Sequence, residues 1–219
     1  MKGLWTKDIK LISSQQKSLL AIWLIAAGIL ITTDQISFAI TYTSIITSMI
    51  GVSTITYDAF DNGNVFLFTL PFTRKEYAME KYLFTLFLGA IAAIGGILLV
   101  IVVMMAKGIF SVNAEEIVTT VLINIPILLI FQSIFLPFQL KYEGEKGRIA
   151  VLATIGAVIF IVIFLFRMFE MAGVELLDIM LNHMYLKNIT LWVSTYIISI
   201  AVWLLSLKIS ERIILKKEF

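Results

Sequence analysis

The stretch YLFTLFLGAIAAIGGILLVIVVMMA, residues 82–106, decides the fold class of this chain. It contains no charged residue and is long enough to cross the hydrocarbon core of a bilayer, about 30 Å thick, as one helix. The composition agrees, because 60% of the 219 residues are hydrophobic, 15% are charged and the mean hydropathy is +0.98. Such a chain has too little polar surface to cover a soluble globule. The sequence therefore predicts an integral membrane protein.

Further apolar runs lie on both sides of this stretch. Backbone groups in lipid must form hydrogen bonds within their own segment, so the runs are expected to be helices. A transmembrane barrel would instead need alternating polar and apolar residues over segments of roughly 10 residues, and no such alternation is present. We expect an all-α polytopic membrane protein with six transmembrane helices in a single domain, residues 1–219. The predicted spans are residues 18–33, 36–57, 82–106, 117–140, 149–166 and 188–207.

Lysine and arginine fall unevenly on the two sides of this arrangement. Of the 17 such residues, 14 lie on one side, and only Lys107, Arg167 and Lys187 lie on the other. Short cytoplasmic loops are enriched in these residues. Both termini and the polar stretch 58–81 are therefore predicted to be cytoplasmic, which requires an even number of spans.

Residues 1–17 show helical periodicity before the first span. Trp5, Ile9 and Ile12 share one face, whereas Lys7 points elsewhere. This pattern predicts an interfacial helix on the cytoplasmic leaflet. A disordered basic anchor is the alternative interpretation.

Motifs for chemistry are almost absent from the sequence. There is no glycine-rich phosphate loop, no His-Glu-x-x-His pair and no cysteine, and the single histidine is His183. No metal site is predicted, and no cofactor is expected to bind this chain. The span centres also lack the charged residues through which ion-coupled carriers work, which disfavours a secondary carrier. Any driving energy is expected to come from another chain.

The polar stretch 58–81 has the features of a docking element. Four successive apolar residues in a cytoplasmic loop favour burial against another surface: they are Val65, Phe66, Leu67 and Phe68. Pro71 ends any preceding helix, and Thr73 with Glu76 has capping-box spacing, so a new helix is predicted to begin at Arg74. The alternative is a loop whose aromatic residues lie on lipid headgroups, with Arg74, Lys75 and Lys81 as anchors.

This stretch resembles the loop between spans two and three of ABC-2-type transporter permeases. The matching residues are Asp58, Asn62, Gly63, Leu70, Pro71, Thr73, Arg74, Lys75, Glu76, Lys81 and Tyr82. Within that family the chain is similar to small stand-alone permeases of Gram-positive bacteria, including exporters of phenol-soluble modulins and related antimicrobial or amphipathic peptides.

The resemblance implies that residues 62–70 form a coupling helix seated on a separate ATP-binding subunit, which would bind ATP and Mg²⁺. The implied ATPase-coupling residues are Asp61, Asn62, Asn64, Val65, Phe66, Leu67, Phe68, Leu70, Pro71, Thr73, Arg74, Lys75 and Glu76. It also implies a homodimer of permeases with two ATPases in a Gram-positive plasma membrane. The expected partners are this ATPase, a second permease copy, membrane lipid and an amphipathic peptide cargo, with no nucleic acid.

The resemblance further implies short helices that dip into the outer leaflet between spans five and six. In residues 167–187, Glu175, Asp178 and Asn182 recur at helical spacing on one face, so we take them as candidate extracellular gate residues. An amphipathic loop helix without a role in transport fits the same pattern.

Polar residues within two spans are candidates for a transport pathway. They are Thr41, Ser44 and Ser48 in span two and Asn124, Gln132 and Gln139 in span four. Such residues also form hydrogen bonds between neighbouring helices, which is the alternative.

The sequence thus predicts the non-enzymatic permease subunit of an ATP-driven exporter of amphipathic peptides. A membrane immunity or sensor protein that binds a peptide without transporting it is one alternative, and a permease for lipid or drug-like cargo is another.

Overall fold

The computed structural model describes residues 2–60, 63–109, 114–142 and 189–217, together with residues 146, 149, 150, 152, 153, 156, 160, 164 and 167. Throughout these ranges the regular structure is helical. The helices are α1 (Lys2–Ser14), α2 (Gln16–Thr33), α3 (Ile36–Ala59), α4 (Gly63–Leu67), α5 (Arg74–Ala106), α6 (Ala114–Tyr142) and α9 (Ile189–Leu215).

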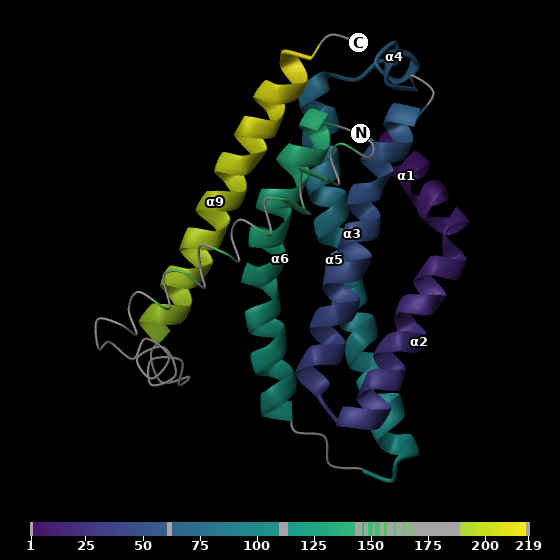
Figure 1. Cartoon of the computed structure of the whole chain (residues 1–219), viewed down its shortest axis with the longest axis vertical. Coiled ribbons are helices and arrows are strands. Elements are labelled where there is room, and N and C mark those ends of the chain that lie inside the picture. The colour runs from purple at the N-terminus through teal and green to yellow at the C-terminus, as the bar shows by residue number, and fades with distance from the viewer. Residues whose placement is uncertain are drawn as a thin grey trace.

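Five of these helices, α2, α3, α5, α6 and α9, are long and apolar enough to cross a membrane. They form an elongated bundle in which α3 packs against α2, α5 and α6, and α9 packs against α5 and α6 (Figure 1). Five of the six predicted spans are thereby confirmed as helices of suitable length. Most of the remaining span, residues 149–166, lies outside the described residues, so the count of six stays a prediction.

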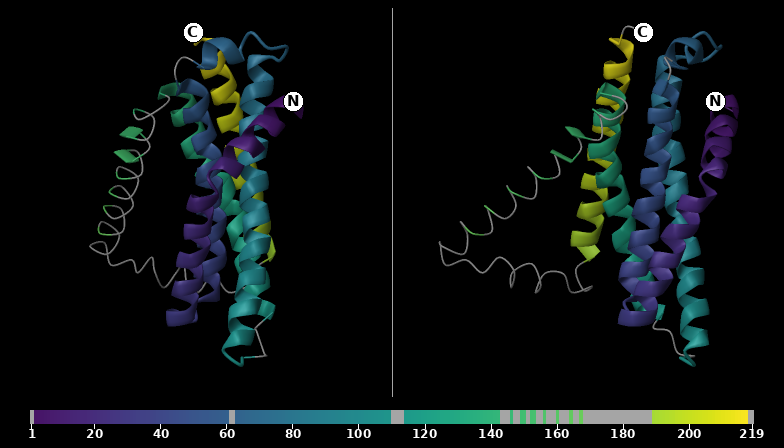
Figure 2. Two further views of the ribbon diagram at one scale, coloured as in Figure 1. Left: turned by 90° about the vertical axis from the view of Figure 1, so that its right-hand side faces the viewer. Right: turned by 45° about the vertical axis from the view of Figure 1, so that its right-hand side comes forward.

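The helices α2, α3, α5 and α6 alternate in direction, and this places α4 at one end of the bundle (Figure 1). The N-terminal helix α1 and the C-terminal end of α9 lie toward that same end (Figure 2). The α6 helix also ends there, whereas α9 begins at the opposite end (Figure 1).

A tight turn around Asp34 joins α2 to α3 at the end of the bundle opposite to α4 (Figure 1). Asp34 closes α2 in the left-handed conformation, with φ of 56°. The Lys107 ammonium, just after α5, donates to the carbonyls of Leu30 (3.2 Å) and Ile31 (2.7 Å) and pairs with the Asp34 carboxylate. The last carbonyls of a helix lack partners within it, and a cation is favourable there. Lys107 therefore joins the α2–α3 turn to α5.

The α1 helix confirms helical structure in the N-terminal segment, but its buried face differs from the predicted one. The buried side chains are Leu4, Asp8 and Ile12, while Ile9 is 52% exposed. The Trp5 ring packs edge-on against Phe84 of α5 at 5.5 Å. Because α1 packs on α3 and α5, contacts within the protein set its position.

Candidate functional site

The short helix α4 is held between the end of α3 and the start of α5. Leu67 is buried in a hydrophobic cluster with Ile55 and Tyr77. Gly63 begins α4 where a Cβ atom would lie 2.7 Å from the Asp58 carbonyl oxygen. This distance is shorter than a van der Waals contact, so the backbone approach requires glycine. The local sequence therefore fixes α4 against α3.

One face of α4 points away from the rest of the protein. Phe66 is 71% exposed and Val65 is 51% exposed, and Phe60 at the end of α3 is 72% exposed. Asn64 is buried, so the exposed and buried sides of this helix are distinct. We call Phe60, Val65 and Phe66 the α4 apolar patch.

Phe68 follows α4 and turns inward. Its ring lies 5.3 Å from the Tyr77 ring and 5.9 Å from the Phe72 ring, and the Arg74 guanidinium lies 5.7 Å from its centroid. The four apolar residues 65–68, which the sequence predicted to form one docking surface, thus fall into two pairs. Val65 and Phe66 face outward, whereas Leu67 and Phe68 support them.

The predicted capping box at the start of α5 is confirmed. The Glu76 backbone N–H donates to the Thr73 hydroxyl at 3.2 Å, and the Thr73 backbone N–H donates to the Glu76 carboxylate at 2.7 Å. The helix begins at Arg74 and continues into the membrane span without a break. One continuous helix of 33 residues therefore connects residue 74 with the membrane span.

Arg74 also joins this region to the C-terminal end of α9. Its Nη1 donates to the carbonyls of Ile214 and Leu215, each at 3.1 Å, and of Lys217 at 2.7 Å. Lys75 and Pro71 are exposed beside it, and Leu70 is 41% exposed. Among the candidate coupling residues, Asp61 and Asn62 lie outside the described residues.

A buried group of charged side chains lies where α1, α3 and α5 meet, next to α4. Lys81 of α5 is fully buried, and its ammonium lies 2.5 Å from Asp8 of α1 and 2.8 Å from Asp58 of α3. It also donates to the Thr54 hydroxyl at 2.9 Å. Lys7 pairs with Asp58 as well. We call these four residues the Lys81 ion cluster: Lys7, Asp8, Asp58 and Lys81. The Glu80 carboxylate lies beside the cluster, 3.9 Å from the Lys81 ammonium.

The Lys81 ion cluster was missed by the sequence interpretation. The alternative in which Lys81 anchors the loop to lipid headgroups is wrong, because none of its side chain is exposed. The available signal was Asp8, which stands between Leu4 and Ile12 at four-residue spacing. A carboxylate on an otherwise apolar helix face needs a buried cation as partner.

Most of the candidate pathway residues form contacts between helices. The Ser44 hydroxyl donates to the Gly89 carbonyl at 2.9 Å, and the Ser48 hydroxyl donates to the Thr85 carbonyl at 3.2 Å. The candidate pathway residues Asn124, Gln132 and Gln139 lie on α6. The Trp203 indole donates to Gln132 at 3.0 Å, Gln139 donates to Thr56 at 2.7 Å, and Asn124 is buried.

A groove of about 1040 Å³ runs between α2, α3 and α6. Of the candidate pathway residues, Gln139 lines it. Within the part of the chain that the structure describes, the lining is made of uncharged apolar, hydroxyl and amide side chains: Gln15, Ser18, Ala21, Ile22, Ile46, Met49, Ile50, Val52, Ser53, Thr56, Tyr57, Phe131, Ile134, Phe135, Gln139 and Leu152.

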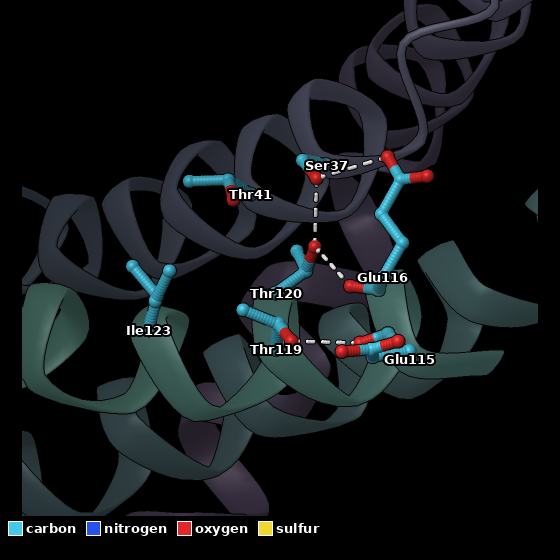
Figure 3. Close-up of a pocket in the computed structure, with 7 residues that line it drawn as sticks. All are labelled: Ser37, Thr41, Glu115, Glu116, Thr119, Thr120 and Ile123. Atoms are coloured by element: carbon cyan, nitrogen blue, oxygen red, sulfur yellow. Dashed lines mark hydrogen bonds between the residues drawn. The ribbon is translucent and has the colours of Figure 1, made fainter. Parts of the chain in front are cut away.

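Thr41 lies elsewhere, in a recess of about 440 Å³ between α3 and the start of α6 (Figure 3). There the Ser37 hydroxyl contacts the Thr120 hydroxyl at 2.8 Å and donates to Glu116 at 3.3 Å. This recess is separate from the groove lined by Gln139. The candidate gate residues Glu175, Asp178 and Asn182 lie outside the described residues.

Comparison with known proteins identifies the family. A family model described as ABC-2 family transporter protein matches residues 3–214. No curated protein matches the chain. No solved structure matches it either. Proteins of this family are the membrane-spanning permease components of ABC transporters, and a separate ATP-binding subunit is their partner. With a match over nearly its full length and a bundle of membrane-length helices, this multi-pass chain belongs to the ABC-2 transporter family.

Proposed function

We propose that this permease is half of an ATP-driven exporter and that α4 is the coupling helix that docks on the ATP-binding subunit. In this proposal two copies of the permease and two ATPases assemble in a Gram-positive plasma membrane. ATP and Mg²⁺ bind to the ATPases, and the cargo is an amphipathic peptide.

The observation that carries the docking proposal is the exposure of Phe66 on a helix that is otherwise firmly held. Leu67 anchors α4 in the core, while Phe66 is 71% exposed at the end of the bundle. Exposed aromatic side chains on a rigid support are typical anchors of protein interfaces. The ATPase is the partner that the family supplies at this position.

The connections of α4 support a role in transmission. The α3 helix leads into α4, and α5 begins seven residues after α4 ends, at the capped residue Arg74. Arg74 in turn contacts the end of α9 through three carbonyls. A displacement of α4 would therefore be transmitted to the three membrane helices α3, α5 and α9.

The charge distribution and the helix directions support the proposed topology. The segment that forms α4 belongs to the side of the predicted topology that holds 14 of the 17 lysine and arginine residues. This bias favours a cytoplasmic location for the end of the bundle with α4. Since α6 ends at this side and α9 begins at the other, one further crossing between them gives six spans and two cytoplasmic termini. We place that crossing in residues 149–166.

The groove between α2, α3 and α6 supports an amphipathic cargo. Its volume of about 1040 Å³ is at the upper end of ordinary ligand sites, and its apolar wall carries a few hydroxyl and amide groups. Such a wall suits the apolar face of a peptide helix, and Gln139 offers a polar contact. A second permease copy facing the groove would close it into one cavity.

The docking proposal is tested by co-expressing the permease with a candidate ATP-binding subunit and measuring co-purification and ATPase activity. We expect Phe66→Asp to abolish both association and stimulation, and Phe66→Leu to retain them. Tyr142→Asp is the matched control, because Tyr142 is also an exposed aromatic at this end of the bundle but lies on α6. If Phe66→Asp associates and turns over like the unmodified permease, α4 is not the coupling helix. Phe68→Asp is unsuitable, since that ring is packed within the protein.

The cargo proposal needs its own experiment. Proteoliposomes that contain the complex are given an amphipathic helical peptide, and ATP hydrolysis is compared with that for a scrambled peptide of equal composition and no apolar face. We expect stimulation by the amphipathic peptide alone. Equal responses to both peptides, or a response to lipid or drug-like compounds only, would contradict peptide export.

A further inference from the structure

We propose that the Lys81 ion cluster fastens α1 to α3 and α5, so that α1 moves as one body with the coupling helix rather than resting independently on the lipid. This inference rests on the proposed function of α4. It assigns positioning roles to Asp8, Asp58 and Lys81, which are buried inside the protein.

The first step is the geometry of the cluster. One ammonium, that of Lys81 on α5, is shared by carboxylates from two other helices, Asp8 on α1 and Asp58 on α3. Asp8 and Lys81 have no exposed surface, and Asp58 is 7% exposed. Separating α1 from the bundle would therefore leave buried charges without their partners, which is strongly unfavourable.

The second step is the continuity between the cluster and α4. Asp58 accepts a hydrogen bond from the Tyr77 hydroxyl at 2.9 Å, and the Tyr77 ring packs on Phe68 directly after α4. The backbone carbonyl of the same Asp58 is the atom that excludes a side chain at Gly63. Asp58 thus contacts both α4 and the cation that holds α1.

The third step is the choice of charged groups over apolar ones. Apolar side chains of similar volume would hold two helices together at least as well as a buried ion pair, because burying charge costs desolvation energy. Apolar contacts also tolerate sliding. A carboxylate aimed at one ammonium instead fixes α1 in a single register on α5, which is what a transmitting element requires.

The fastening is tested first on the permease itself, reconstituted in lipid nanodiscs. The chain has no cysteine, so Leu4→Cys introduces a unique thiol at a position that is 4% exposed. We expect Lys81→Met to increase its rate of reaction with a membrane-impermeant maleimide by roughly tenfold, since local opening controls access to a buried thiol. A thiol at the exposed position of Ile9 should react at the same rate in both backgrounds.

Two further variants separate fastening from general damage. Glu80→Gln replaces a carboxyl group whose oxygens form no hydrogen bond within the described residues, so the thiol at position 4 should stay protected. The conservative variant Lys81→Arg keeps a cation for both Asp8 and Asp58, so the thiol should remain protected. If Lys81→Met leaves the thiol protected, or if Glu80→Gln exposes it equally, the cluster does not fasten α1.

The motion is tested in the complete complex with the ATP-binding subunit. Spin labels are placed at Ile9 on α1 and at Met105 near the far end of α5, both on exposed surface and away from α4. We expect the distance between them to be equal in the nucleotide-free and ATP-trapped states of the otherwise unmodified complex, and to change with ATP in the Lys81→Met background.

A change of this distance with ATP in the otherwise unmodified complex would overturn the inference, because α1 would then move relative to α5. Failure of the proposed function has a different signature. In that case no ATP-binding subunit associates with the permease even when Phe66 is intact, and the role of α1 in transmission is then excluded as well. The thiol experiment needs no ATPase, so it still decides whether the cluster fastens α1.

Discussion

The Lys81 ammonium donates to Asp8 Oδ2 across 2.5 Å, although 73 positions separate the two residues in the chain. Both side chains are completely buried. The pair joins the first helix of the protein to the beginning of a membrane span. A buried ion pair does not add stability over apolar packing, but its loss on one side is costly because the remaining charge stays in a dry environment.

We therefore expect Lys81→Met to lower the free energy of unfolding by about 3–5 kcal/mol, the range for breaking a buried pair by removing one partner. The measurement is chemical unfolding of the purified permease in detergent. In a double-mutant cycle with Asp8→Asn, the combined variant should lose less than the sum of the single losses, by about 0.5–3 kcal/mol. Additive losses would show that Asp8 and Lys81 do not stabilise each other.

The start of α5 could be predicted from sequence because its signals are local. Thr73, Glu76 and Pro71 act within one helical turn, and the helix begins at the predicted residue Arg74. The apolar spans follow from length and composition in the same way. The Lys81 ion cluster could not be predicted so readily, since it forms only where α1, α3 and α5 converge. Asp8 marked the position but not its partner.

The α4 segment shows where local pattern is insufficient. A run of four apolar residues predicts a docking element, but it does not predict which of them face outward. Phe68 is drawn inward by Tyr77 and Arg74, which come from the following helix, so only Val65 and Phe66 remain exposed. The polar span residues are a similar case. Gln132 and Gln139 share a face of α6, yet only Gln139 lines the groove.

Close packing of α3 on α5 predicts a strong effect at Gly96. A Cβ atom there would lie 2.6 Å from the Thr43 hydroxyl oxygen and 3.2 Å from the Ile40 Cα atom. We expect Gly96→Ala to lower the free energy of unfolding by about 1–3 kcal/mol, the usual cost of overpacking. Gly28→Ala is the matched control, because nothing lies within 4 Å of that position. It should stabilise the protein by up to about 1 kcal/mol through helix propensity. Equal effects at the two glycines would contradict the close contact.

Loss of the capping box should loosen the connection between α4 and α5. Thr73→Ala removes the acceptor for the Glu76 backbone N–H, so the first turn of α5 should open more often. We expect amide hydrogen exchange in residues 74–77 to become roughly fivefold faster, in line with the usual strength of an N-cap. Thr32→Ala is the control, since that hydroxyl bonds only to carbonyls of its own helix. Unchanged exchange in residues 74–77 would show that the cap does not hold this turn.

Gln132 and Gln139 form a matched pair that separates packing from transport. Both are buried on α6 and both donate to a hydroxyl of α3, Gln132 to Ser48 at 3.5 Å and Gln139 to Thr56 at 2.7 Å. Replacing Gln139 by leucine should lower the free energy of unfolding by about 0.6 kcal/mol, the average for such bonds between membrane helices. Replacing Gln132 should cost about twice as much, because Gln132 also accepts a hydrogen bond from the Trp203 indole. Only Gln139→Leu should also reduce ATPase stimulation by the amphipathic peptide, because only Gln139 lines the groove. Equal stimulation in the two variants would exclude the groove as the peptide route, and a selective loss in Gln132→Leu would move that route to the interface of α6 with α9, where Trp203 contacts Gln132.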